Sequence, residues 1–159
     1  SGGPVSWQKY FGSRNVVNMG FGWDRIENVL WRVYHGELDS IAPEQIILMI
    51  GTNNLELNSD EEIIAGLQFL IKAIRVKQPH APILLLGILP RRDMEKRVAG
   101  LNAGLASLKL GEKVHYADAG KLFLKPSGKI DESLFSDGLH PDEEGYGKLG
   151  KFILSQTGN

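Results

Sequence analysis

Apolar residues along this chain follow two alternating patterns, one with the period of β-strands and one with the period of helices. Short runs rich in Ile, Leu and Val, which are typical of strands, occupy residues 15–19, 45–50, 82–89 and 114–118. Stretches with apolar positions three and four residues apart, which are typical of amphipathic helices, occupy residues 24–35, 60–78, 94–110 and 141–155. This alternation predicts an α/β fold with a parallel sheet between two layers of helices.

Particular residues support these boundaries. Asp24 is a suitable N-cap for the helix that follows it, and Gly36 stands where that helix is expected to end. Pro79 comes directly after the long helical pattern, which it would stop. The uninterrupted apolar run at residues 45–50 predicts a strand that is covered on both faces.

Length, charge and cysteine content narrow the choice of function. The 159 residues are enough for one domain with a sizeable core, so a single domain over residues 1–159 is expected. A net charge of -1 gives no basic surface for nucleic acid, and no apolar run reaches the roughly 18 residues of a membrane span. With no cysteine, the chain has neither disulfides nor thiolate chemistry, and the cellular compartment stays open, with a weak preference for a secreted or periplasmic location.

Two short segments directly follow predicted strands, and a third lies in the long loop between the last predicted strand and the last predicted helix. They are Gly-Phe-Gly-Trp-Asp at residues 20–24, Gly-Thr-Asn-Asn at residues 51–54 and Asp-Gly-Leu-His-Pro at residues 137–141. In parallel α/β sheets ligands bind beyond the carboxyl ends of the strands, so these segments are expected to meet there. The sequence therefore predicts a binding or catalytic site at that edge of the sheet.

The residue types in these segments suit ester hydrolysis. An aspartate three residues before a histidine can hold one ring nitrogen and leave the other as a base, which makes Asp137 and His140 the candidate base pair. Asn53 can donate a side-chain N–H to an oxyanion. The alternatives are simpler, because an Asp-x-x-His pair is often incidental and an asparagine after a strand is often only a turn residue.

In order and spacing, the three segments resemble the SGNH (GDSL-type) hydrolase superfamily, and especially its platelet-activating-factor acetylhydrolase catalytic subunits. The resemblance implies a three-layer α/β/α flavodoxin-like fold and a serine esterase that needs no metal or organic cofactor. It also implies that Asn53 and the turn at Gly22 and Trp23 form the oxyanion hole. The family has a Gly-Gly pair in this turn, and Trp23 replaces the second glycine. We expect the indole to narrow the acyl pocket toward acetyl groups.

The family's nucleophile has no match in this chain. None of the ten serines ends a strand in a Gly-x-Ser context, and the resemblance places both the nucleophile and the central first strand upstream of Ser1. We therefore expect an upstream fragment to supply the serine, with the loop at residues 1–4 as a possible nicking point. The expected substrate is a small ester, possibly an acetylated carbohydrate or lipid. The alternative is a non-catalytic binding domain or pseudo-enzyme; a nucleotide binder is disfavoured because the chain has no phosphate-binding glycine loop.

Overall fold

The computed structural model describes residues 4–157, which pack as two compact units. The sheet unit comprises residues 20–88 and 101–117. The terminal unit comprises residues 1–19, 89–100 and 118–159. The single domain expected over residues 1–159 stays a prediction.

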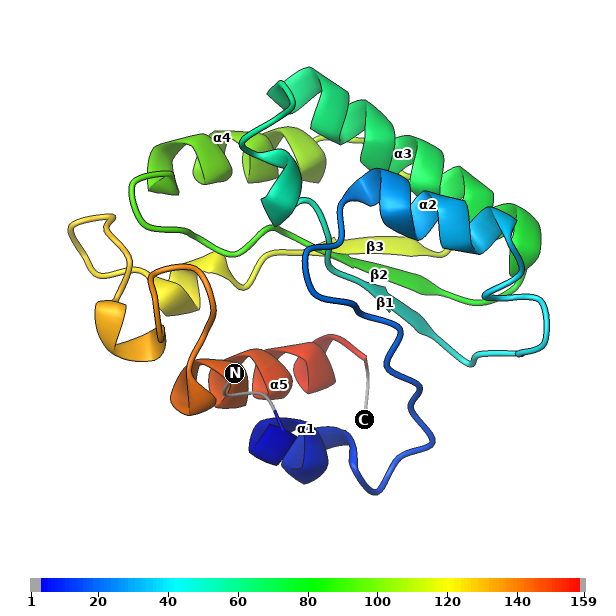
Figure 1. The fold of residues 1–159 in the computed structure, drawn as a ribbon, viewed down its shortest axis with the longest axis horizontal. Helices are drawn as coiled ribbons and strands as arrows, with labels where there is room; N and C mark the ends of the chain where they lie inside the picture. Colours follow the sequence, from blue (N-terminus) through cyan, green and yellow to red (C-terminus); the bar gives the residue numbers. More distant parts are fainter. Residues whose placement is uncertain (1–3, 158–159) are drawn as a thin grey trace. The chain divides into compact units, whose positions relative to one another are not determined.

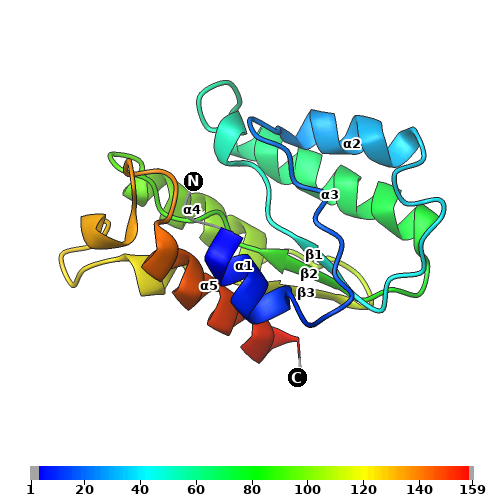
Figure 2. The same cartoon turned by 60° about the horizontal axis from the view of Figure 1, so that its bottom comes forward.

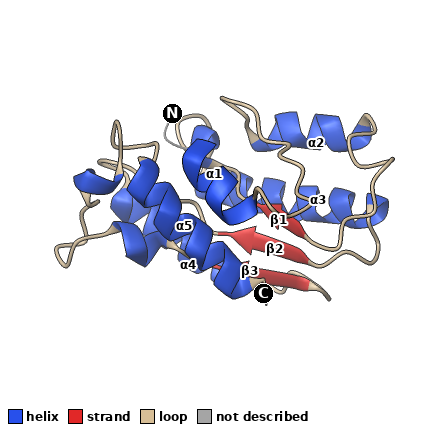
Figure 3. Cartoon of the chain, turned by 90° about the horizontal axis from the view of Figure 1, so that it is seen from below, coloured by secondary structure: helices blue, strands red, loops and turns tan. Residues whose placement is uncertain are grey.

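A three-stranded parallel sheet forms the centre of the sheet unit (Figure 3). Its strands lie in the order β1-β2-β3, and Ile83 of β2 pairs with Ile46 of β1 on one side and with Val114 of β3 on the other. All four residues of β2 are buried, as expected for a central strand. The bounds are β1 Ile46–Leu48, β2 Ile83–Leu86 and β3 Val114–Ala117.

Two helices, α2 (Ile26–Tyr34) and α3 (Asp60–Lys77), pack against each other and lie on the same face of this sheet (Figure 1). The sequence defines both ends of α3. Ser59 accepts a hydrogen bond from the backbone N–H of Glu62, whose carboxylate accepts the N–H of Ser59 in return, so a capping box begins the helix. The helix ends before Pro79, as predicted.

In the terminal unit, α1 (Pro4–Phe11) and α5 (Glu143–Gln156) pack side by side (Figure 2). Tyr10 lies against Gly150, where a Cβ atom would stand only 2.7 Å from the Tyr10 ring, so the missing side chain allows the close packing. Ser6 donates a hydrogen bond to the carbonyl oxygen of Glu143 at 3.1 Å. The other helical segments are η2 Gly120–Phe123, η3 Glu132–Leu134 and α4 Glu95–Ala106, whose second half belongs to the sheet unit.

The prediction of a strand over residues 15–19 is wrong, because this segment has no regular secondary structure. A strand needs a neighbour for its backbone N–H and C=O groups, and within residues 4–157 no strand pairs with this segment. The prediction that the strand at residues 45–50 is covered on both faces is also wrong. Leu48 is buried, whereas Ile47, which points to the opposite face, is 40% exposed.

Asp24 is not the N-cap of α2. Arg25 takes that position, and its backbone N–H donates to the side-chain oxygen of Asn28 at 3.0 Å. Asp24 does not cap because Arg32 binds its carboxylate. The remaining predicted strands and helices are confirmed with shorter bounds, and so is the α/β class with a parallel sheet. The loop expected at residues 1–4 lies outside the described residues, except for Pro4, which begins α1.

Candidate functional site

Asp137 and His140 lie together in the terminal unit, in the loop before α5. The Nδ1 atom of His140 lies 2.7 Å from one carboxylate oxygen of Asp137. The other carboxylate oxygen accepts the backbone N–H groups of Leu139 at 2.9 Å and His140 at 2.7 Å. The backbone of this loop therefore fixes the carboxylate, and the carboxylate in turn orients the imidazole.

These hydrogen bonds also control the charge of Asp137. The backbone and side-chain hydrogen bonds from His140, followed by the backbone bond from Leu139, hold the pKa of Asp137 far below its ordinary value. The carboxylate therefore stays ionised at any pH near neutral. An ionised carboxylate at Nδ1 favours the tautomer with the proton on that nitrogen, which leaves Nε2 as the basic atom. The His140 side chain is 59% exposed, so the ring is accessible.

Arg92 holds the same loop from outside. Its guanidinium forms two hydrogen bonds with Glu132, at 2.8 and 2.6 Å, and donates a third to the carbonyl oxygen of Asp137 at 3.1 Å. Its backbone N–H donates to the carbonyl of Gly138 at 2.9 Å. Gly138 has a φ of +82°, which favours glycine, and a Cβ atom there would lie 2.5 Å from the Arg92 guanidinium carbon, so a larger residue would displace the guanidinium.

Beside these residues lies a hollow of about 310 Å³, lined by Arg91, Arg92, Asp137, Gly138 and Leu139. All five lining residues belong to the terminal unit. A second hollow of about 290 Å³ lies between α2 and α3 in the sheet unit, and Ile26, Asn54 and Phe69 are among its lining residues; none of the predicted site residues lines it.

Asn53 belongs to the sheet unit, in the short 3₁₀ helix η1 (Thr52–Asn54) that follows β1. The turn begins at Gly51, whose φ of +120° is a conformation that glycine adopts without strain. The side-chain nitrogen of Asn53 donates to the backbone carbonyl oxygen of Asp24 at 2.9 Å. Its neighbour Asn54 is buried and accepts the backbone N–H of Ile26 at 3.0 Å, so Asn54 joins η1 to the start of α2.

Gly22 and Trp23 form a tight turn between residues 21 and 24. The backbone N–H of Asp24 donates to the carbonyl oxygen of Phe21 at 3.4 Å. Trp23 has a φ of 67°, in the left-handed region that an ordinary side chain disfavours, and its side chain is 86% exposed. The indole therefore leaves the backbone of the turn uncovered.

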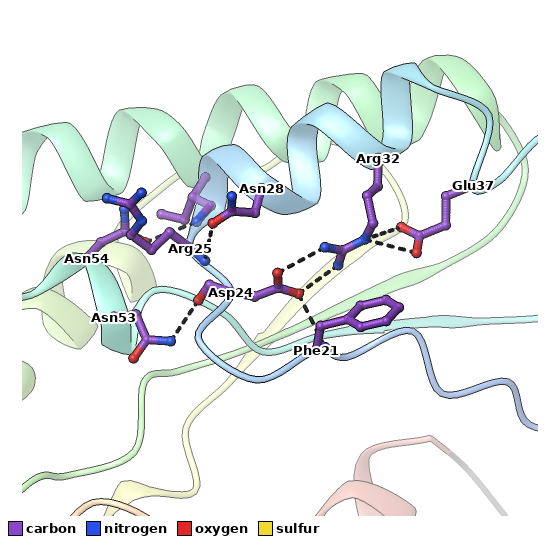
Figure 4. Close-up of polar contacts among 9 residues, drawn as sticks. Phe21, Asp24, Arg25, Asn28, Arg32, Glu37, Asn53 and Asn54 are labelled. Atoms are coloured by element: carbon purple, nitrogen blue, oxygen red, sulfur yellow. Dashed lines mark hydrogen bonds and ion pairs between the residues drawn. The ribbon is translucent and has the colours of Figure 1, made fainter.

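A partly buried ion network supports this turn (Figure 4). Arg32 donates to both carboxylate oxygens of Asp24, at 2.9 and 2.7 Å, and its Nε atom donates to Glu37 at 3.0 Å. Chiefly through the hydrogen bonds from Arg32, the pKa of Asp24 is lowered and that of Arg32 is raised. The sequence analysis missed Arg32 and Glu37, because their link to Asp24 is not visible in any linear motif.

The structure thus joins the predicted site residues into two groups. Asp137 and His140 form one group in the terminal unit, and Asn53 lies with the turn at Gly22 and Trp23 in the sheet unit. The convergence of the two groups on one cavity stays a prediction. Among residues 4–157, no cluster of three metal-ligating side chains was found, and no helix has the length and apolar character that a membrane crossing needs.

Comparison with known proteins gives a consistent assignment. The model of the GDSL-like Lipase/Acylhydrolase family matches residues 1–148. The chain is 34% identical over 150 residues to platelet-activating factor acetylhydrolase IB subunit alpha2 of Homo sapiens, an alignment that covers 91% of this chain and 65% of that protein. The chain thus spans less than two thirds of the length of that relative.

Two solved structures share the fold. One is a GDSL-like lipase from Bacteroides thetaiotaomicron, with a TM-score of 0.80, 16% identity, and coverage of 96% of this chain and 80% of that chain. The other is a family 3 carbohydrate esterase from Clostridium thermocellum, with a TM-score of 0.67, 23% identity, and coverage of 86% and 66%. These likenesses confirm the flavodoxin-like fold class predicted from the sequence.

Proposed function

The chain belongs to the GDSL-like lipase/acylhydrolase family, and we propose that it carries the catalytic base and part of the oxyanion hole of a serine esterase for small acyl esters. The observation that carries this proposal is the contact of 2.7 Å between His140 Nδ1 and the fixed carboxylate of Asp137. This is the arrangement that a base needs to accept a proton from a serine hydroxyl.

In the proposed mechanism, Nε2 of His140 takes the proton of the serine as the serine oxygen attacks the ester carbonyl. Asp137 stabilises the imidazolium that forms. The tetrahedral intermediate then collapses, the His140 proton passes to the leaving alcohol, and an acyl-enzyme remains. Water, deprotonated by the same histidine, attacks the acyl-enzyme; the acid leaves as the acyl–serine bond breaks, and the proton on His140 returns to the serine oxygen.

The negative charge of the intermediate would be held by Asn53 and by the backbone N–H at Trp23. Asn53 uses one of its two amide hydrogens on Asp24, and within residues 4–157 no protein acceptor is bonded to the second. A backbone donor needs no particular side chain, and the left-handed φ of Trp23 resembles the conformation that a glycine would adopt at this position. Removing one oxyanion donor typically lowers kcat about 10²- to 10³-fold.

The nucleophile of this mechanism would be a serine from outside residues 1–159. Ser136 is the serine closest to His140 in sequence, but its hydroxyl donates to the backbone carbonyl of His140 at 3.1 Å, on the main chain rather than the ring. The arrangement of the sheet is consistent with a further strand that would carry the serine. Among residues 4–157, β1 has a strand neighbour on one side only, and the exposed Ile47 and Met49 offer apolar surface to a further strand.

We propose an acetyl ester as substrate, with an acetylated carbohydrate or an acetylated lipid as the alcohol part. The human relative is named an acetylhydrolase of platelet-activating factor, and one structural neighbour is a carbohydrate esterase, so both alcohol classes occur among similar proteins. Acetate release from acetylated sugars and from acetyl phospholipids, measured side by side, would decide between them.

The test is the rate of p-nitrophenyl acetate hydrolysis by the protein expressed together with its upstream coding sequence. We expect His140→Ala to lower kcat by about 10²- to 10⁴-fold. The exposed His80, which lies outside the proposed site, supplies the matched control, and His80→Ala is expected to leave the rate unchanged. A rate that is the same in His140→Ala would refute the proposed base. An inactive protein that still binds acetylated ligands would favour the non-catalytic binding domain.

A further inference from the structure

Asp24 connects three separate parts of the sheet unit through its carboxylate and its backbone carbonyl. One carboxylate oxygen accepts the backbone N–H of Phe21 at 3.3 Å, which closes the turn that contains Trp23. Both oxygens are bound by Arg32 on α2. The backbone carbonyl of the same residue accepts the side-chain amide of Asn53. Asp24 therefore holds both donors that we propose for the oxyanion hole. It binds the Asn53 amide directly, and it closes the turn that contains the backbone N–H of Trp23.

Arg32 fixes Asp24 by more than its charge. The guanidinium meets the carboxylate with two parallel hydrogen bonds, which set orientation as well as distance. On its other side, Glu37 binds Nε, and the ring of Phe21 lies 4.7 Å from the guanidinium carbon. The side chains of Arg32, Asp24 and Glu37 are only 18%, 12% and 19% exposed, so water competes little for these contacts.

Asn53 depends on this support. In the part of the chain that the structure describes, the hydrogen bond to Asp24 is the only one made by its side chain. An amide held at a single point takes its direction from that point, so a shift of the Asp24 carbonyl turns the second N–H of Asn53 by a similar amount. Misplacement of about 1 Å at a reacting centre lowers a rate by about 10².

We propose that Arg32 is a positioning residue for the oxyanion hole, which acts through Asp24 to aim the Asn53 amide and to hold the turn at Trp23. The inference rests on the proposed function, because the oxyanion roles of Asn53 and Trp23 are part of it. Arg32 touches no substrate in this role. Its contribution passes entirely through the residues that it orients.

The first test follows the Asn53 side-chain amide directly, by its ¹H–¹⁵N NMR signals, which are assigned by their loss in Asn53→Ala. We expect Arg32→Gln to move these signals toward those of a free asparagine amide. Arg32→Lys keeps the charge without the two-pronged contact and should give an intermediate shift. The control is Lys77→Gln, which breaks the 2.7 Å ion pair with Asp39 elsewhere in the sheet unit and should leave the signals in place.

The second test is a double-mutant cycle on kcat, in the protein that contains its nucleophile. We expect Arg32→Gln to lower kcat about 10- to 100-fold with KM nearly unchanged. The Arg32→Gln, Asn53→Ala double variant should lose less kcat than the product of the two single losses, because the part of the Arg32 effect that passes through Asn53 is already absent in Asn53→Ala. If Arg32→Gln fails to fold, as judged by circular dichroism, Arg32→Lys replaces it in both tests.

The outcomes separate the inference from the proposed function. Unchanged Asn53 amide signals in the Arg32 variants, or fully additive losses of kcat, would overturn the positioning role. If the wild-type protein hydrolyses no ester, or Asn53→Ala is as fast as wild type, the proposed function fails. In that case the amide signals alone decide whether Arg32 positions Asn53.

Discussion

Trp23 gives a prediction whose magnitude follows from the backbone. Its φ of 67° lies in the left-handed region, which costs an ordinary residue about 1–2 kcal/mol, whereas glycine adopts it without that cost. Glycine loses more conformational entropy on folding, by about 0.5–1 kcal/mol. Trp23→Gly should therefore exceed Trp23→Ala in free energy of unfolding by about 0.5–1 kcal/mol, or about 1–4 °C in Tm for a chain of this size.

The indole itself should contribute little, because it is 86% exposed. Trp23→Ala is therefore expected within about 0.5 kcal/mol of wild type. Gly22→Ala provides the matched control, since Gly22 has no left-handed φ and a Cβ atom there would meet nothing within 4 Å. Urea unfolding followed by circular dichroism measures all four proteins.

Equal stability of Trp23→Gly and Trp23→Ala would refute the left-handed turn. A large loss in Trp23→Ala would show that the indole is packed. Both variants keep the backbone N–H, so both should keep their deacetylation rate. If the indole narrows the acyl pocket, Trp23→Gly should hydrolyse butyrate esters faster relative to acetate esters than wild type does.

Three further predictions concern charge, loop support and the sheet edge. Because Arg32 lowers the pKa of Asp24 below its ordinary value of 3.8, the pair stabilises the fold above that pH and its contribution is lost as the pH falls further. Asp24→Asn should thus be less stable than wild type by about 1–3 kcal/mol at pH 7. In urea unfolding, this difference in stability should narrow below pH 4. A difference that stays constant with pH would show that the ion pair is absent. Arg92→Gln should lower kcat about 10- to 100-fold with little change in Tm, and Arg92→Lys should recover part of the rate; an unchanged kcat would exclude support of the His140 loop by Arg92. Ile47→Lys should weaken binding of a separately added upstream segment, measured by calorimetry, whereas unaltered binding would place that segment elsewhere.

The sequence predicted those features that depend on local pattern. Polar residues following apolar strands located Asn53, and the spacing of Asp137 and His140 placed their side chains within hydrogen-bonding distance of each other. β2 was predicted for the same reason, since a buried run bounded by proline has few alternatives.

Features that depend on pairing in space were not predictable in this way. Residues 15–19 have the apolar composition of a strand, but composition alone supplies no partner for the backbone. The ion network of Arg32 joins residues whose separations follow no motif, and the contact of Arg92 with the His140 loop spans 45 residues of sequence. Both contacts required the fold to be known.

The central claim is that His140 activates a serine for attack on an ester, and covalent trapping tests it most directly. The protein, expressed with its upstream coding sequence, is treated with a fluorophosphonate, and the adduct is located by intact-mass and peptide mass analysis. We expect one adduct, on a serine outside residues 1–159, which forms in wild type and far more slowly in His140→Ala. The absence of an adduct in wild type, or equal rates of labelling in the two proteins, would contradict it.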